Sequence, residues 1–169
     1  SKRSSKSLRL HFRPVFKNRE AMSYTLGYVG HSWELFALRS WIVAFLVFAG
    51  AEKTGLSILS ATIIAGAASI IGGPISIIGN ELSERYGRRK TIIVIMVLAS
   101  LMAMITGYSA SLSLGAAALF IIIYSGFVMG DSASLTAGAA GAAVSGYRGA
   151  TLAVHSILGF SGALLGPLS

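Results

Sequence analysis

The residues of this chain that could do chemistry stand inside apolar surroundings. His31, Glu34 and Arg39 lie within an apolar and aromatic run at residues 21–50. If this run crosses a membrane as a helix, Glu34 lies near the bilayer midplane, where a charge costs at least about 2.5 kcal/mol. Such a charge needs a partner or a water-filled cavity.

Two roles are open to these groups. His31 and Glu34 are three residues apart and share a helix face, whereas Arg39 lies about 140° around the helix from Glu34. Facing a cavity, His31 and Glu34 would bind a solute or carry a coupled proton. Arg39 would then pair with an acid on another helix or with an anionic solute. In the alternative, Glu34 and Arg39 belong to structural ion pairs and meet no solute.

Other candidate residues are spread along the chain. Trp33 and Trp41 are expected to pack against neighbouring helices, with stacking on a ligand as the alternative. Asp131 lies in another apolar run and is expected to pair with Arg148 or with the arginines at residues 85–89. His155 is expected to form a hydrogen bond between helices, with a proton relay as the alternative.

Several kinds of chemistry are missing from the sequence. The chain has no cysteine, no spacing of metal ligands, no phosphate-binding loop and no set of nucleophile and base. We therefore expect no metal site, no cofactor and no enzyme activity.

Long apolar blocks must position these residues. The chain has 169 residues, of which 54% are hydrophobic and only 12% are charged, against about 25% charged in an ordinary soluble domain. A helix of about 20 apolar residues crosses the bilayer. Strands are excluded because the runs are too long and do not alternate. We predict an all-α, polytopic membrane helical bundle at residues 20–169, with spans at about 21–50, 56–78, 91–108, 114–140 and 149–169.

The cations are unevenly distributed along this path. On one side of the membrane lie seven cations in the basic segment at residues 1–19, four in the loop after the second span, and Arg148 after the fourth span. Lys53 alone lies in a loop on the other side. Cytoplasmic loops collect Lys and Arg. We therefore expect a multi-pass protein of the cell (plasma or inner) membrane with its first residues cytoplasmic. The basic segment is expected to lie beside the lipid bilayer, without a nucleic-acid partner, although arms that bind anionic lipid or nucleic acid have the same composition.

A charged motif, NELSERYGRR, occupies residues 80–89 between the second and third spans. Carboxylates and guanidinium groups on a short cytoplasmic loop can pair with one another and with the ends of neighbouring helices. Such contacts can lock one state of a moving bundle. The alternative is that these cations only anchor the loop in the cytoplasm.

This motif resembles motif A of the major facilitator superfamily. Glu84 stands where the family has aspartate, and Asn80 where it has its first glycine. The positions that match are Leu82, Arg85, Gly87, Arg88 and Arg89. The resemblance implies that the motif is a conformational latch, formed by Glu84, Arg85, Gly87, Arg88 and Arg89.

A second segment resembles motif C of the same family. It reads GFSGALLGP at residues 159–167 and places Gly162, Gly166 and Pro167 at the family's spacing. Small residues four apart let two helices approach closely, and proline bends a helix. The resemblance implies that these residues pack helices together.

The resemblance covers essentially the whole chain. It implies a secondary active transporter that moves a small solute, with or without a coupled ion, by alternating access of two six-helix halves. Because the first span follows a long basic segment, we expect a fragment of the carboxyl-terminal half, whose partner is the missing other half of the same protein. An amino-terminal half is the alternative. The alternative function is a non-transporting membrane receptor or assembly protein with the same bundle.

Overall fold

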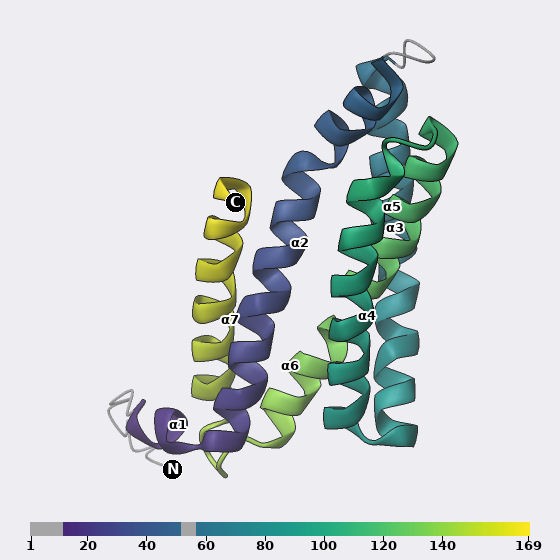
Figure 1. The fold of residues 1–169 in the computed structure, drawn as a ribbon. Coiled ribbons are helices and arrows are strands. Elements are labelled where there is room, and N and C mark those ends of the chain that lie inside the picture. The colour runs from purple at the N-terminus through teal and green to yellow at the C-terminus, as the bar shows by residue number, and fades with distance from the viewer. Residues whose placement is uncertain (1–11, 52–56) are drawn as a thin grey trace, which may run out of the picture.

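The computed structural model describes residues 12–51 and 57–169, and these residues form a bundle of helices (Figure 1). Most of the basic segment at residues 1–19, and Lys53, lie outside the described residues. The elements are α1 (Arg13–Lys17), α2 (Arg19–Ala51), α3 (Ile58–Tyr86), α4 (Arg88–Ser109), α5 (Leu114–Gly130), α6 (Ser132–Gly141), α7 (Arg148–Leu165) and the 3-10 turn η1 (Gly166–Leu168).

Within the described residues, five helical segments are long and apolar enough to cross a membrane. They are Arg19–Gly50, Ile58–Tyr86, Arg88–Ser109, Leu114–Gly141 and Arg148–Leu168. Large apolar side chains such as Ile70, Met104 and Leu164 are exposed on their outer surfaces, as expected for helices that face lipid. The predicted all-α polytopic membrane bundle is confirmed.

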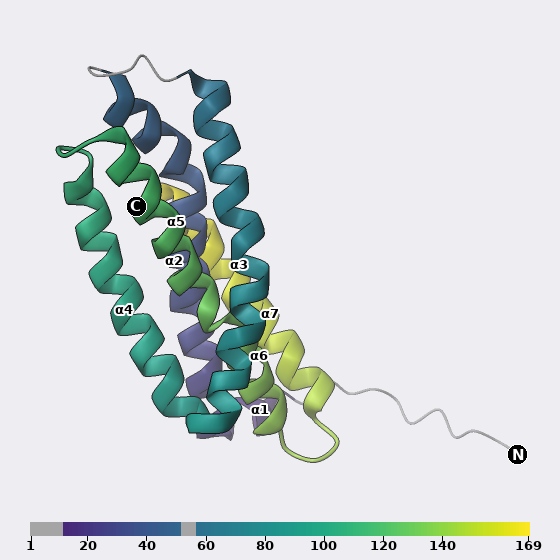
Figure 2. The same cartoon turned by 90° about the vertical axis from the view of Figure 1, so that its right-hand side faces the viewer.

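The helix α2 is the central element of the bundle. It contacts α1, α3, α5, α6, α7 and η1. In Figure 1, α7 lies along one side of α2, and α3, α4 and α5 lie on the other. Figure 2 shows α3 and α4 on either side of α5. Side chains of α2 can therefore meet both groups of helices.

The second span continues farther than the expected end at residue 78. Helix α3 runs to Tyr86, and only Gly87 separates it from α4. Gly87 has a φ of 97°, a conformation that glycine adopts at little cost because it lacks a Cβ. The charged motif, expected on a loop, is instead helical on both sides of this one-residue turn.

The fourth span, Leu114–Gly141, has a break of one residue at Asp131, which separates α5 from α6 and keeps right-handed helical dihedral angles. The Asp131 side chain does not cap α6. Instead, the backbone amide of Ala133 donates a hydrogen bond of 3.2 Å to the Ser76 hydroxyl of α3. A side chain of another helix thus accepts a hydrogen bond from the first turn of α6, and the Asp131 carboxylate is available for a different contact.

Asn18 connects the beginning of α2 to the end of α6. Its side-chain oxygen accepts a hydrogen bond of 3.2 Å from the amide of Ala21, as an N-terminal helix cap does. Its side-chain nitrogen donates a hydrogen bond of 2.6 Å to the carbonyl oxygen of Ala142. One amide side chain thus connects the start of α2 to the end of α6.

Glycines allow the closest helix contacts. A Cβ at Gly162 would overlap the carbonyl oxygen of Val29, and one at Gly166 would lie 2.7 Å from that of Trp33. Helix α7 and the turn that contains Pro167 therefore lie directly against the backbone of α2. Between α3 and α5, a Cβ at Gly79 would overlap the carbonyl oxygen of Gly130.

This packing predicts opposite effects of two alanine substitutions in α3. Gly79→Ala is expected to lower the free energy of unfolding, because overpacking costs about 1–3 kcal/mol and the opposing atom belongs to the backbone. Gly66→Ala is the control, because its Cβ would meet nothing within 4 Å and alanine favours helix by about 1 kcal/mol. Thermal unfolding of the full-length protein in detergent measures both, and equal midpoints would contradict the predicted close approach.

Candidate functional site

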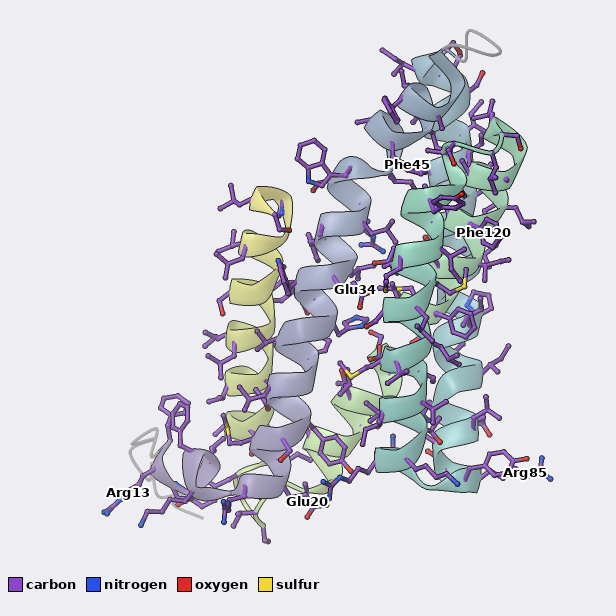
Figure 3. All side chains as sticks on the ribbon, viewed as in Figure 1. Arg13, Glu20, Glu34, Phe45, Arg85 and Phe120 are labelled. Atoms are coloured by element: carbon purple, nitrogen blue, oxygen red, sulfur yellow. The ribbon has the colours of Figure 1, made fainter. Side chains whose placement is uncertain are left out.

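The polar residues of α2 lie at mid-depth of the bundle. Helix α2 has 33 residues, so residue 35 is its centre. His31, Glu34 and Arg39 span about 12 Å along the helix axis around that centre. Figure 3 shows Glu34 at mid-height, whereas Arg13, Glu20 and Arg85 lie at one end of the bundle. His31, Glu34 and Arg39 thus lie at mid-depth of the bundle.

His31 contacts Asp131 at the break between α5 and α6. Its Nδ1 atom lies 2.8 Å from the Asp131 Oδ1 atom, and each residue is only 3% exposed. The separation is within the range of an ion pair, although its angles are not those of a hydrogen bond. The contact joins the centre of α2 to the fourth span.

This contact corrects the predicted pairing of Asp131. Arg148 is exposed at the start of α7, and Arg88 contacts other groups, so within the described residues Asp131 pairs with neither. The reason is that α2 packs over both α5 and α6, which brings His31 to the break. The sequence offered no sign of this arrangement, because it depends on how α2 is rotated.

His155 connects three helices. Its Nδ1 atom lies 3.4 Å from the Thr25 hydroxyl of α2, and its Nε2 atom lies 3.3 Å from the Thr136 hydroxyl of α6. The Thr25 hydroxyl donates to the carbonyl oxygen of Ala21, so it can only accept from His155. The Thr136 hydroxyl likewise donates to the carbonyl oxygen of Ser132, so a neutral imidazole can donate to only one of the two threonines.

Tyr28 lies between the two buried histidines. Its ring stacks on His155 with centroids 4.2 Å apart and on His31 with centroids 5.5 Å apart. Sequence analysis missed Tyr28, because a tyrosine in an apolar span is common packing material. Its spacing, three residues before His31, was the available signal.

Glu34 lies one turn after His31 on α2 and contacts Tyr124 of α5. The Tyr124 hydroxyl donates a hydrogen bond of 2.9 Å to Glu34 Oε1. Both residues line a groove of about 450 Å³, which Trp33 and Ser100 also line. The structure therefore separates Glu34, which reaches a groove, from His31, which is buried against Asp131.

Arg39 lines a different groove, between α2, α3 and α5. Its guanidinium carbon lies 5.9 Å from the centre of the Phe36 ring, within the range of a cation–π contact. Among residues 12–51 and 57–169, no carboxylate lies within ion-pair distance of it. The acid on another helix, expected as one partner of Arg39, is thus not found there. Trp41 is 54% exposed and contributes to neither groove.

Arg88 is the centre of the charged motif. It donates hydrogen bonds of 2.8 Å to the Asn80 side chain and 3.1 Å to the carbonyl oxygen of Ser134, and lies 3.4 Å from the Glu84 carboxylate. Asn80 donates to the same carboxylate oxygen at 3.1 Å. The guanidinium group thus connects α4 to α3 and to α6.

Ser134 makes a second connection at the same place. Its hydroxyl lies 2.7 Å from that of Ser83, and both serines are buried. Sequence analysis missed Ser134, since nothing in its spacing from the motif signals the contact. Arg85 and Arg89, by contrast, are exposed, and Arg85 lies over the ring of its neighbour Tyr86. The motif is therefore divided between one bridging arginine and two that face outward.

Comparison with known proteins identifies the family of this bundle. The family model described as Major Facilitator Superfamily matches residues 1–167. The chain belongs to the major facilitator superfamily. It is therefore a membrane transporter chain of the major facilitator kind, and the family consists of transporters rather than enzymes. No curated protein and no solved structure matches the chain significantly.

The buried pair predicts a non-additive response to mutation. His31→Gln leaves the Asp131 carboxylate without its partner and Asp131→Asn leaves the imidazole without its own, each at an expected cost of about 3–5 kcal/mol. The double variant removes both partners of the contact, so its loss should be smaller than the sum. Thermal unfolding of the full-length transporter in detergent gives the three values. Additive losses would show that the two side chains do not interact.

The motif predicts different roles for adjacent arginines. Arg88→Gln is expected to cost about 1–3 kcal/mol of local stability, because it removes charged hydrogen bonds to α3 and α6. Hydrogen exchange at residues 132–141 should become faster. Arg89→Gln removes the same charge from an exposed neighbour and serves as the matched control. Equal exchange in the two variants would contradict the bridge to α6.

Proposed function

We propose that this chain is part of a secondary active transporter that carries a small solute by alternating access, with its site at mid-depth of α2. The observation that carries the proposal is the break in the fourth span at Asp131, beside the buried contact to His31. In membrane transporters, ionisable groups within the spans mark solute and ion pathways and proton relays, and His31 and Asp131 are two such groups in contact. A static receptor or assembly protein needs neither feature.

The proposed roles follow from where each side chain lies. The candidates for contact with solute are the residues that line grooves. They are Glu34 and Trp33 in one groove and Arg39 in the other. His31 and His155 are buried between helices, which suits them to hold a coupled proton rather than to touch solute. Trp41 is exposed and is placed to meet lipid or the other half of the transporter.

The charged motif supports the proposed movement. Arg88 connects α4 to α6, and α6 follows the break at Asp131. A change in the angle at the break would therefore stretch or release the Arg88 bridge. We assign the latch to Glu84, Arg85, Gly87, Arg88 and Arg89, with the exposed arginines placed to contact a neighbouring half.

The proposed orientation follows from the cations. Arg13 and Arg85 lie at the same end of the bundle (Figure 3). Together with the cation count of the whole sequence, this favours a cytoplasmic location for that end, in the plasma or inner membrane. The other half of the same protein would supply the second wall of the solute site, as in transporters built from two repeats.

Replacement of Glu34 tests the proposed function. In liposomes that contain the full-length protein, we expect uptake of at least one solute from a panel of labelled cations, neutral molecules and anions. Glu34→Gln should lower that uptake about 10- to 100-fold, the effect of losing a charged hydrogen-bonding group. Glu81→Gln removes an exposed acid outside both the grooves and the Arg88 bridge and should transport normally.

Two results would contradict this proposal. Uptake, expression and binding that are all unchanged in Glu34→Gln would exclude Glu34 from the site. Solute binding by the full-length protein without uptake above that of protein-free liposomes would favour the receptor function instead.

A further inference from the structure

We propose that the groove between α2, α3 and α5 binds a small organic anion through Arg39, so that the transported solute is a monoanion with an apolar body. This inference rests on the proposed transport function and adds the chemical class of the solute. Its starting observation is a guanidinium group at mid-depth of the bundle that has no carboxylate partner among the described residues.

An unpaired arginine at this depth needs an explanation. Arg39 is four residues from the centre of α2, about 6 Å along the axis, well inside a hydrocarbon core of about 30 Å. An arginine side chain carries a positive charge in proteins. Ionisable residues at such positions pair with a partner or line a site for an ion or solute.

The five described acids do not supply a partner for Arg39. Glu34 accepts a hydrogen bond from Tyr124, and Asp131 contacts His31. The other three acids lie near the end of the bundle that is expected to be cytoplasmic: Glu20, Glu81 and Glu84.

The groove around Arg39 has the size and lining of a small-molecule site. Its volume is about 530 Å³, within the range of about 300–1,000 Å³ found for ligand pockets. Most of its wall is aliphatic, with Leu38, Ile42 and Ala65 among the lining residues. An apolar wall with one cation suits an organic anion better than a small, strongly hydrated inorganic ion.

The polar groups of the groove are suited to a carboxylate. The planar guanidinium group presents paired N–H donors that match the two oxygens of a carboxylate. Ser125 of α5 also lines the groove, and its hydroxyl forms no hydrogen bond within the described part of the chain. Thr62 and Ser69 line it too, but their hydroxyls donate to backbone carbonyl oxygens of α3. Arg39 and Ser125 are therefore the two donors free for a ligand.

The charge balance selects a monoanion. Arg39 is the only charged residue among those that line this groove in the described parts of the chain. The groove with Glu34 lies on the α4 side of α2, whereas this one lies on the α3 side, so the carboxylate of Glu34 does not line it. One cation in an apolar wall neutralises one negative charge.

The test measures binding separately from transport. The full-length protein in detergent is titrated with aliphatic and aromatic monocarboxylates, each compared with its neutral amide and its ammonium analogue, and with nitrate. Binding is followed by the thermal unfolding midpoint and by tryptophan fluorescence. At least one carboxylate should stabilise the protein while its amide and ammonium analogues do not.

Variants assign that binding to Arg39. Arg39→Gln should weaken carboxylate binding about 10- to 100-fold, Arg39→Lys should retain part of it, and Ser125→Ala should weaken it less than Arg39→Gln. Arg148→Gln removes an exposed arginine outside the groove and should bind as the unmodified protein does.

Each other outcome overturns the inference in a recognisable way. If no carboxylate stabilises the protein more than its amide, or if binding is unchanged in Arg39→Gln, the site is not an anion site. If nitrate alone reproduces the effect, the ligand is inorganic. If cations or neutral solutes are transported and carboxylates do not bind, this inference fails while the transport function stands. If carboxylates bind at Arg39 but no solute crosses the membrane, the transport function fails instead.

Discussion

The contact between α2 and the break in the fourth span is the interaction on which the rest of the bundle depends. His31 and Asp131 meet where both are almost completely buried. A single charge left without a partner in such surroundings is strongly unfavourable, so the pair sets the position of α2 along the fourth span. With α2 placed in this way, Tyr28 stacks between His31 and His155 and brings α7 into contact with the same helix.

Close backbone contacts complete this arrangement. In lipid, apolar side chains gain little by associating, and helices are held by van der Waals packing and by polar contacts. The glycines at 162 and 166 let α7 and η1 lie against the backbone of α2, and Gly79 does the same for α3 against Gly130. The second contact adjoins the break at Asp131, so α3 and α5 pack closely beside it.

The two sides of α2 carry different polar groups because α5 packs between α3 and α4. Arg39 opens into a groove on the α3 side, and Glu34 with Tyr124 lines a groove on the α4 side. His31 is buried between them and connects α2 to α6 through Asp131. Groups exposed in grooves are suited to recognition, whereas a buried pair at a helix break is suited to respond to a change in helix angle.

The sequence by itself determined the number and type of the spans and the family, because bilayer thickness sets the length of an apolar run and the motif residues are adjacent in the chain. It also singled out His31, Glu34, Arg39 and Asp131, since ionisable residues in apolar runs are few. Only the tertiary structure decided their partners. Asp131 contacts His31 rather than Arg148. Residues 80–86 are helical rather than a loop, and Arg88 contacts Ser134. Partners depend on the rotation of each helix and on where a span breaks, and both are set by contacts between segments far apart in the chain.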